Sequence, residues 1–387
     1  MKSNTLTTKI AILSISMFFL GGVAVLGTMP HLRDHFGLTQ MQVELLMSGI
    51  AISKIAAIFI SEPIAKRVGL KNTCTLGLFL IGLAGFLPLI SHNYTFILAS
   101  RLTYGAALGL FNGLAIRFIT LIYSGKTRSV MLGLRGAVES AGIIVLTLLA
   151  GLLMNISWHL SFTIYLLAWP VAIFFHLNVS KVEEVEEPGH HHREKIPPIV
   201  FGLAFFAVLV VINIASIAMR FPAIGTEIHG SGFNASHWIA LKPFAAILAG
   251  MSFGKLKFKI GRNVFHLGLL AIVIANILVA FSGDRFYLLV LGSAMSQVCA
   301  AWTFPFIVEQ LADITTSSNH KLAMLIFLLG TNVGNFASTL TMGAIHFILR
   351  NDNLTAPFYI YGILFGILLM GIMLQHHYLN KKKPSLG

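Results

Sequence analysis

The stretch Glu62-Pro-Ile-Ala-Lys-Arg-Val-Gly-Leu-Lys71 lies between two long apolar runs, and Gly254-Lys-Leu-Lys-Phe-Lys-Ile-Gly-Arg-Asn263 repeats its character further along the chain. Both stretches are basic. In both, a Lys or Arg stands two residues before a glycine, Gly69 in the first and Gly261 in the second. A short basic turn of the same kind therefore joins two apolar segments in each half of the chain.

A second pair of residues has the same spacing as these two glycines. Pro30 and Pro222 each close the first apolar run of their half, and they lie as many positions apart as Gly69 and Gly261, almost half of the 387 residues. Two unrelated features that share one offset indicate that the chain is a duplicated unit.

The composition sets the class of protein. Hydrophobic residues make up 56% of the chain and charged residues 11%, and the mean hydropathy is +0.83. Soluble domains have about 25% charged residues, so this composition excludes a soluble globular protein. Both cysteines, Cys74 and Cys299, lie in apolar runs, which excludes a disulfide framework and a cysteine-based metal site.

Apolar runs of roughly 20 residues recur along the chain, and a run of this length predicts a membrane-spanning helix. We therefore predict an all-α membrane protein with six spans in each half. Residues 1–177 form one six-helix bundle, 178–197 a cytoplasmic linker, and 198–387 a second bundle with a short basic tail. The twelve predicted spans are 10–29, 42–62, 72–91, 94–117, 130–154, 158–177, 198–220, 237–254, 264–281, 286–309, 321–348 and 355–376.

The positions of Lys and Arg predict the orientation. With the amino terminus in the cytoplasm, most basic residues fall in inner segments, and the outer segments hold only Arg33, Arg220, Arg285 and Arg350. This is the asymmetry of the positive-inside rule, and it places both termini in the cytoplasm. It also accounts for most of the net charge of +13, so we expect the lipid bilayer as a partner and no nucleic acid.

The predicted linker is acidic and contains three consecutive histidines, His190 to His192. Imidazole is a common metal ligand. However, clustered ligands in a flexible acidic loop usually form an adventitious site, so we predict no functional metal site and no cofactor.

At this point the chain resembles the major facilitator superfamily of secondary transporters, whose loop motif is G-x-x-x-D-R-x-G-R-K. The resemblance spans the full length, through the twelve spans, the central loop and the repeated basic turn. The matching positions are Arg67, Gly69 and Lys71 in the first copy and Gly254, Lys259, Gly261 and Arg262 in the second. Lys66 and Phe258 replace the aspartate of the motif. In the family this aspartate belongs to a charge relay, so the resemblance predicts that the relay differs here.

The family also has an arginine in the fourth span followed by glycines, which Arg101, Gly105, Gly109 and Gly113 match. Glycines at this spacing alternatively serve close helix packing alone. The resemblance implies two six-helix bundles in the plasma membrane that move a small solute by alternating access.

Charged residues inside the spans are the candidate site, because a charge at mid-membrane is costly unless it is paired or hydrated. Lys54 and Lys242 lie in the second and eighth spans, and two such cations could hold a small anion. The alternatives are a local ion pair for Lys54 and snorkelling to the interface for Lys242. Arg101 and Trp302 are further candidates for substrate binding, although the aromatic cluster around Trp302 is equally typical of packing.

Arg135 and Glu139 are four residues apart and share one face of the fifth span. Glu139 is the only carboxylate that we place well inside a span, and it is the candidate proton carrier. A permanent structural ion pair is the alternative. Other charged residues near span ends, among them Glu44 and Arg220, are expected to snorkel.

Arg117 and Glu309 occupy equivalent positions at the inner ends of the fourth and tenth spans. They could meet as a cytoplasmic gate, and interfacial anchoring is the alternative.

Cations outnumber carboxylates inside the spans, so we expect a monomeric, non-enzymatic secondary active transporter for a small anionic or polar organic solute, with protons as a candidate coupling ion. The alternative is an efflux antiporter for lipophilic, often cationic compounds. The fifth span has no proline in Met131 to Met154, whereas antiporter members of the family usually carry a Gly-Pro pair there. A membrane enzyme or receptor is a further alternative, but the histidines are scattered and no nucleotide-binding loop is present.

Overall fold

The computed structural model describes residues 5–91, 93–111, 113–180, 195–316, 319–351 and 353–382. These residues form helices and connecting turns without strands. Among the described residues, 11 helices are long and apolar enough to cross a membrane, and the bent pair Leu6–Phe18 and Gly21–Phe36 raises the number to 12 if it is one span. The predicted all-α, twelve-span fold is thus confirmed. His190 to His192 lie outside the described residues.

The described helices form two compact units. The N-terminal unit contains the elements as far as α8 together with Asn234–Leu241, and the C-terminal unit contains the other parts of α9 to α14. The elements of the N-terminal unit are α1 (Leu6–Ser14), η1 (Ile15–Phe18), η2 (Gly21–Val23), η3 (Leu26–Thr28), α2 (Met29–Phe36), α3 (Gln40–Val68), α4 (Leu70–Ile90), α5 (Tyr94–Phe111), α6 (Leu114–Ile122), α7 (Gly125–Met154), η4 (Trp158–Leu167) and α8 (Ala168–Asn178).

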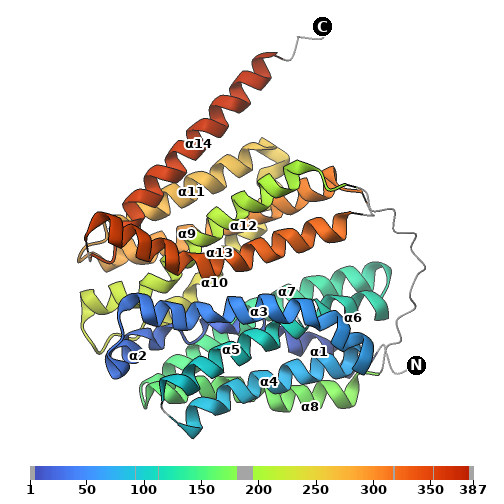
Figure 1. Cartoon of the computed structure of the whole chain (residues 1–387). Coiled ribbons are helices and arrows are strands. Elements are labelled where there is room, and N and C mark those ends of the chain that lie inside the picture. Colours follow the sequence, from blue (N-terminus) through green and yellow to red (C-terminus); the bar gives the residue numbers. More distant parts are fainter. Residues whose placement is uncertain are drawn as a thin grey trace. The chain divides into compact units, whose positions relative to one another are not determined.

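In the C-terminal unit, α9 packs against α12 and α13, and α11 packs against α12 and α14 (Figure 1). These helices are α9 (Pro198–His229), α10 (Ser236–Ile260), α11 (Asn263–Ala280), α12 (Phe286–Ile314), α13 (His320–Leu349) and α14 (Ala356–Lys382). The start of α10 belongs to the N-terminal unit because Asn234 anchors it there. The Asn234 amide donates hydrogen bonds to Gly151 O and to Asn155 Oδ1, both at 2.9 Å.

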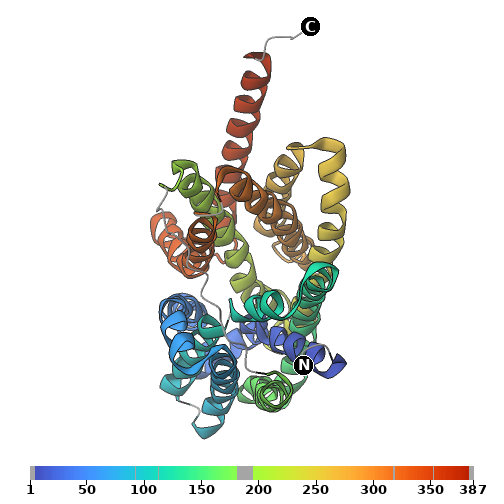
Figure 2. The ribbon, with the colours of Figure 1, turned by 90° about the vertical axis from the view of Figure 1, so that its right-hand side faces the viewer.

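In the N-terminal unit, α5 packs between α3 and α4, and the three helices appear together in Figure 2. The glycines of α5 explain its close approach to α3. A Cβ at Gly109 would lie 2.5 Å from Lys54 O, and a Cβ at Gly105 would lie 2.2 Å from Ile50 O. Gly113 has no atom near such a Cβ. Two of the three motif glycines therefore have a packing role, and they place the Lys54 turn of α3 against α5.

The predicted first span is not one straight helix. It consists of α1, three short 3-10 helices and α2, and its two halves are bent by 42°. Two tyrosines stabilise the irregular part because they satisfy carbonyl groups in it: Tyr104 Oη donates to Phe18 O at 2.6 Å, and Tyr165 Oη donates to Gly21 O at 2.9 Å. Phe19, between these two carbonyls, is thereby held in a defined position.

In both basic turns, a helix ends at a glycine with a positive φ. The first helix of each pair ends just before the motif glycine, since α3 ends at Val68 and α10 ends at Ile260. Gly69 and Gly261 adopt positive φ values of 86° and 57°, which glycine reaches without steric cost. The duplication inferred from the sequence therefore extends to the backbone of the turns.

Candidate substrate and proton site

Lys54, Arg135, Glu139 and Phe19 come together in the N-terminal unit, and we call this group the charged cluster. Lys54 lies in α3, and Arg135 and Glu139 lie in α7. α7 also passes close to the irregular first span, because a Cβ at Gly142 would lie 2.4 Å from Met17 O. These approaches place residues from three segments around one ring.

The geometry of the charged cluster is compact. Arg135 forms an ion pair with Glu139, and each of the two side chains is 15% exposed. The Phe19 ring attracts both cations, since Lys54 Nζ lies 5.1 Å and Arg135 Cζ lies 5.5 Å from its centroid. The Glu139 carboxylate also interacts electrostatically with Lys54. Two positive charges thus share one carboxylate and one aromatic ring.

This charge balance determines what the charged cluster can bind. Among the described residues of the cluster, one carboxylate neutralises one of the two cations, and the second cation retains a positive charge beside the Phe19 ring. An unbalanced charge at membrane depth attracts a counter-ion strongly, because Coulomb interactions are weakly screened there. The arrangement can therefore accept one anionic group.

Arg101 lies in a different environment. Its side chain has no exposed surface, and Tyr104, Phe162 and Tyr165 enclose it, with guanidinium-to-centroid distances of 4.8 to 5.7 Å. It donates to Tyr165 Oη at 3.4 Å. Since Tyr104 and Tyr165 hold the irregular first span, Arg101 supports the segment that carries Phe19, and a solute cannot reach it in this conformation.

Lys242 repeats the cation-on-ring arrangement in the C-terminal unit. Its Nζ lies 4.1 Å from the centroid of Phe221, a buried residue of α9. In both halves, a lysine from the second span lies over a phenylalanine from the first. The sequence contains 30 phenylalanines, and neither Phe19 nor Phe221 has a pattern that distinguishes it from the others.

The indole N–H of Trp302 in α12 is already hydrogen-bonded to α10. It donates to Ala249 O at 2.9 Å and to Ser252 Oγ at 3.1 Å. Any contact of Trp302 with a solute would therefore use its ring face.

The candidate gate residues lie in separate units. Glu309 forms an ion pair with Lys257, and both side chains are 41% exposed. Lys257 precedes Phe258, the residue at the aspartate position of the loop motif, which is 96% exposed. Lys257 is a cation, so it does not replace the negative charge of that aspartate. In this pair the negative charge comes from Glu309. Arg117 lies in α6, within the candidate span Tyr94–Ile122. The gate between Arg117 and Glu309 stays a prediction.

Two charged residues that we expected at the membrane interface are buried. Glu44 has no exposed surface, and Gln40 donates a hydrogen bond to it at 2.8 Å. Arg220 is 3% exposed, because α9 continues to His229 and places Arg220 well inside the helix. The snorkelling expectation was therefore wrong for Glu44 and Arg220.

Comparisons with known proteins agree with this architecture. The chain is 21% identical to the quinolone resistance protein NorA of Staphylococcus aureus (strain COL) over 373 residues, 93% of each protein. It is also 21% identical over 335 residues to a TsgA homolog of Buchnera aphidicola subsp. Baizongia pistaciae (strain Bp), covering 85% of this chain and 84% of that protein.

Among solved structures, the nucleoside transporter NupG (D323A mutant) has a TM-score of 0.76 at 15% identity, with coverage of 95% of this chain and 99% of that one. A D-xylose-proton symporter has a TM-score of 0.73 at 14% identity, with coverage of 94% and 95%. The family model described as Major Facilitator Superfamily matches residues 11–202 and 201–386. The chain is therefore a multi-pass membrane protein that belongs to the Major Facilitator Superfamily of transporters.

Proposed function

We propose that this protein is a secondary active transporter for a small organic anion, and that the charged cluster binds the anionic group. One observation carries the proposal: Lys54 and Arg135 face the same Phe19 ring and share a single carboxylate, Glu139. A carboxylate or phosphate of the solute would supply the missing negative charge. Arg135 suits this role because its guanidinium can form two parallel hydrogen bonds with such a group.

Protonation of Glu139 provides a route to proton coupling. In the ion pair, the Glu139 carboxylate binds the guanidinium of Arg135. A proton on Glu139 removes that negative charge and releases Arg135 for the solute. The bound anion and the Glu139 carboxylate have like charges and compete for the same guanidinium, so anion binding favours protonation of Glu139, and protonation favours anion binding. This coupling predicts symport of the anion with a proton.

Other residues complete the proposal. Lys242 on Phe221 is the second anion-binding group by analogy with Lys54 on Phe19. Arg101 positions the first span, and Trp302 would contact the solute through the face of its ring. We place the protein in the cell membrane with both termini in the cytoplasm, following the positive-inside asymmetry.

A thermal-shift panel tests the proposal. Purified protein is heated with small carboxylates and organic phosphates on one arm, and with quinolones and quaternary ammonium compounds on the other. A ligand that binds the folded state raises the melting temperature with its concentration. We expect shifts with anions that are lost in Lys54→Ala and in Arg135→Gln. Lys126→Ala, an exposed lysine in the first turn of α7, is the matched control and should retain them.

Export of lipophilic cations is the second candidate function, favoured by the similarity to the quinolone resistance protein. In this case Glu139 and Phe19 would hold the cation, and Lys54 and Arg135 would oppose it. Shifts with the cationic compounds that survive in Lys54→Ala but disappear in Glu139→Gln would establish this function and reject anion transport.

A further inference from the structure

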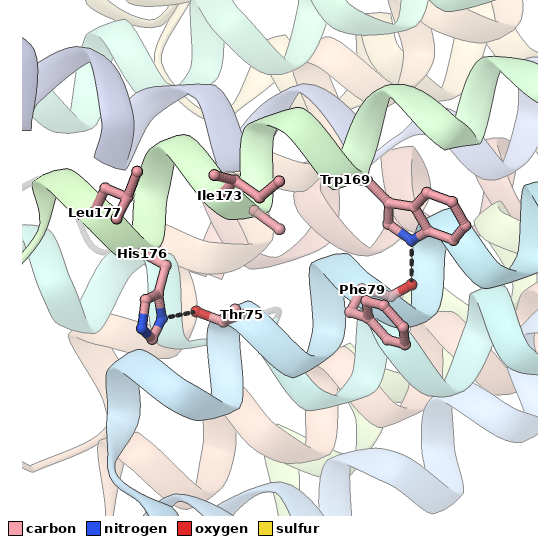
Figure 3. A pocket seen from close by; sticks show the side chains of 7 residues that line it. Thr75, Phe79, Trp169, Ile173, His176 and Leu177 are labelled. Atoms are coloured by element: carbon pink, nitrogen blue, oxygen red, sulfur yellow. Dashed lines mark hydrogen bonds between the residues drawn. The ribbon is translucent and has the colours of Figure 1, made fainter.

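A groove of about 480 Å³ lies between α4 and α8 on the N-terminal unit, apart from the charged cluster. Phe79 of α4 and Trp169, Ile173 and Leu177 of α8 line most of it, and Thr75 and His176 lie at one end (Figure 3). Both helices belong to candidate membrane spans. Phe79, Ile173 and Leu177 are 52%, 61% and 76% exposed, so the groove is open at the surface of these two candidate spans.

The wall of the groove is fixed by specific contacts. Trp169 stacks on Phe79 with an interplanar angle of 18°, and its Nε1 donates to Phe79 O at 3.1 Å. The indole lies directly over Gly82, where a Cβ would come within 2.0 Å of Nε1. Glycine at this position therefore makes the space that the indole occupies. The groove is a built feature of α4 and α8.

The polar end of the groove is basic. His176 Nδ1 and the Thr75 hydroxyl are hydrogen-bonded at 3.2 Å, and Thr75 Oγ1 donates to Lys71 O at 3.0 Å. Lys71 is thus one turn from Thr75 on the same face of α4. α1 reaches the same end of α8, since Thr8 Oγ1 donates to Asn178 O at 3.0 Å.

We propose that this groove binds one acyl chain of an anionic glycerophospholipid, with the lipid phosphate against Lys71 and His176. Two observations favour this occupant: the long wall is apolar and open at the surface of two candidate spans, and the short end is basic. The volume lies within the roughly 300–1,000 Å³ typical of small-molecule sites. The positive-inside orientation puts Lys71 on the cytoplasmic side, where basic pockets between membrane helices bind anionic head groups.

Trp169 is a natural reporter for this site, because it is one of four tryptophans and forms the groove wall. The protein is placed in nanodiscs that contain increasing fractions of phosphatidylglycerol or phosphatidylcholine with brominated acyl chains, which quench tryptophan fluorescence on contact. The difference between the wild type and Trp169→Phe isolates the Trp169 signal. We expect quenching by brominated phosphatidylglycerol to saturate at a low lipid fraction, and quenching by brominated phosphatidylcholine to rise in proportion to its fraction.

Two matched pairs of variants localise the effect. We expect native mass spectrometry to detect bound phosphatidylglycerol on the wild type. Ile173→Trp fills the groove and should abolish this binding. Ile199→Trp, at an α9 residue that is 58% exposed, should retain it. In the quenching assay, Lys71→Ala should weaken the preference for phosphatidylglycerol by about fivefold, the factor that corresponds to one lysine–lipid contact, and Lys126→Ala should leave it unchanged.

Three results would overturn the inference. The first is equal quenching by the two brominated lipids. The second is a change of oligomeric state in Ile173→Trp without loss of lipid, which would make the groove a contact between two copies. The third is displacement of quenching by quinolones, which would make it a drug site. None of these results depends on Lys54, Arg135 or Glu139, so the test is independent of the proposed transport function.

Discussion

Phe19 has an unusual position for a membrane phenylalanine, because both a lysine and an arginine lie over its ring. The ring attracts the two cations while they are out of contact with bulk water, so it helps to keep both in place for a shared anion. A cation–π contact contributes about 0.5–2 kcal/mol, depending on how far it is desolvated.

We therefore predict that Phe19→Leu weakens anion binding by roughly fivefold, which corresponds to about 1 kcal/mol. The melting temperature without ligand should change little, since leucine retains most of the apolar packing. Titration calorimetry of the purified variant measures the affinity. Phe59→Leu, at a 61% exposed position of α3, is the control. Equal affinities for the two variants would remove Phe19 from the site.

A substitution at Glu139 distinguishes anion binding from coupling to protons. In Glu139→Gln the side chain is permanently neutral and Arg135 has no carboxylate partner in α7. We predict that proteoliposomes with this variant still exchange anion across the membrane at equal concentrations, but no longer accumulate it in response to a pH gradient. Uptake of labelled anion with and without the gradient gives both quantities. Gradient-driven accumulation at the wild-type level would exclude Glu139 as the proton carrier.

At the scale of single elements, the contact of α5 with α3 determines where Lys54 lies. Gly109→Ala would place a methyl group 2.5 Å from both Lys54 O and Ala57 Cβ, so the helices would have to move apart. Overpacking of this kind costs typically about 1–3 kcal/mol.

We accordingly predict that Gly109→Ala lowers the melting temperature in detergent and weakens anion binding, because the Lys54 turn moves. Gly113→Ala, four residues further along, introduces a methyl group with no atom within 4 Å, and it should have neither effect. Similar melting temperatures for the two variants would contradict this account of the helix contact.

The ion pair between Lys257 and Glu309 connects the end of α10 with α12. Both side chains are 41% exposed, and exposed pairs contribute about 0.2–1 kcal/mol. A double-mutant cycle with Lys257→Ala and Glu309→Ala should therefore give a coupling free energy below about 1 kcal/mol in thermal unfolding. A substantially larger value would show that the pair is a major structural contact of the C-terminal unit.

For the whole molecule, hydropathy and duplication were sufficient to predict the class, the number of spans and the family. These features are spread over hundreds of residues, so an error in the boundary of one span does not change the predictions. The cost of charge in a membrane also pointed to Lys54, and separately to the pair Arg135 and Glu139, as candidates, and the structure brings the three into one cluster. These predictions rest on properties that are visible residue by residue.

Other features depend on tertiary contacts and have no sequence signal of their own. Phe19 lies in the charged cluster because tyrosines from α5 and η4 hold an irregular segment of the first span. Glu44 is buried because of the face of α3 on which it lies, and its distance from the end of the span did not predict this. Neither composition nor residue spacing predicts the position of Phe19 or the burial of Glu44.

Titration calorimetry of anion binding in two buffers with different ionisation enthalpies tests the central claim most directly, because the difference in heat counts the protons taken up with the ligand. The probe is the carboxylate or phosphate with the largest thermal shift. The account predicts proton uptake with anion binding in the wild type, no uptake in Glu139→Gln, and strongly weakened binding in Arg135→Gln. Anion binding of wild-type affinity in Arg135→Gln, or binding to the wild type without proton uptake, would contradict it.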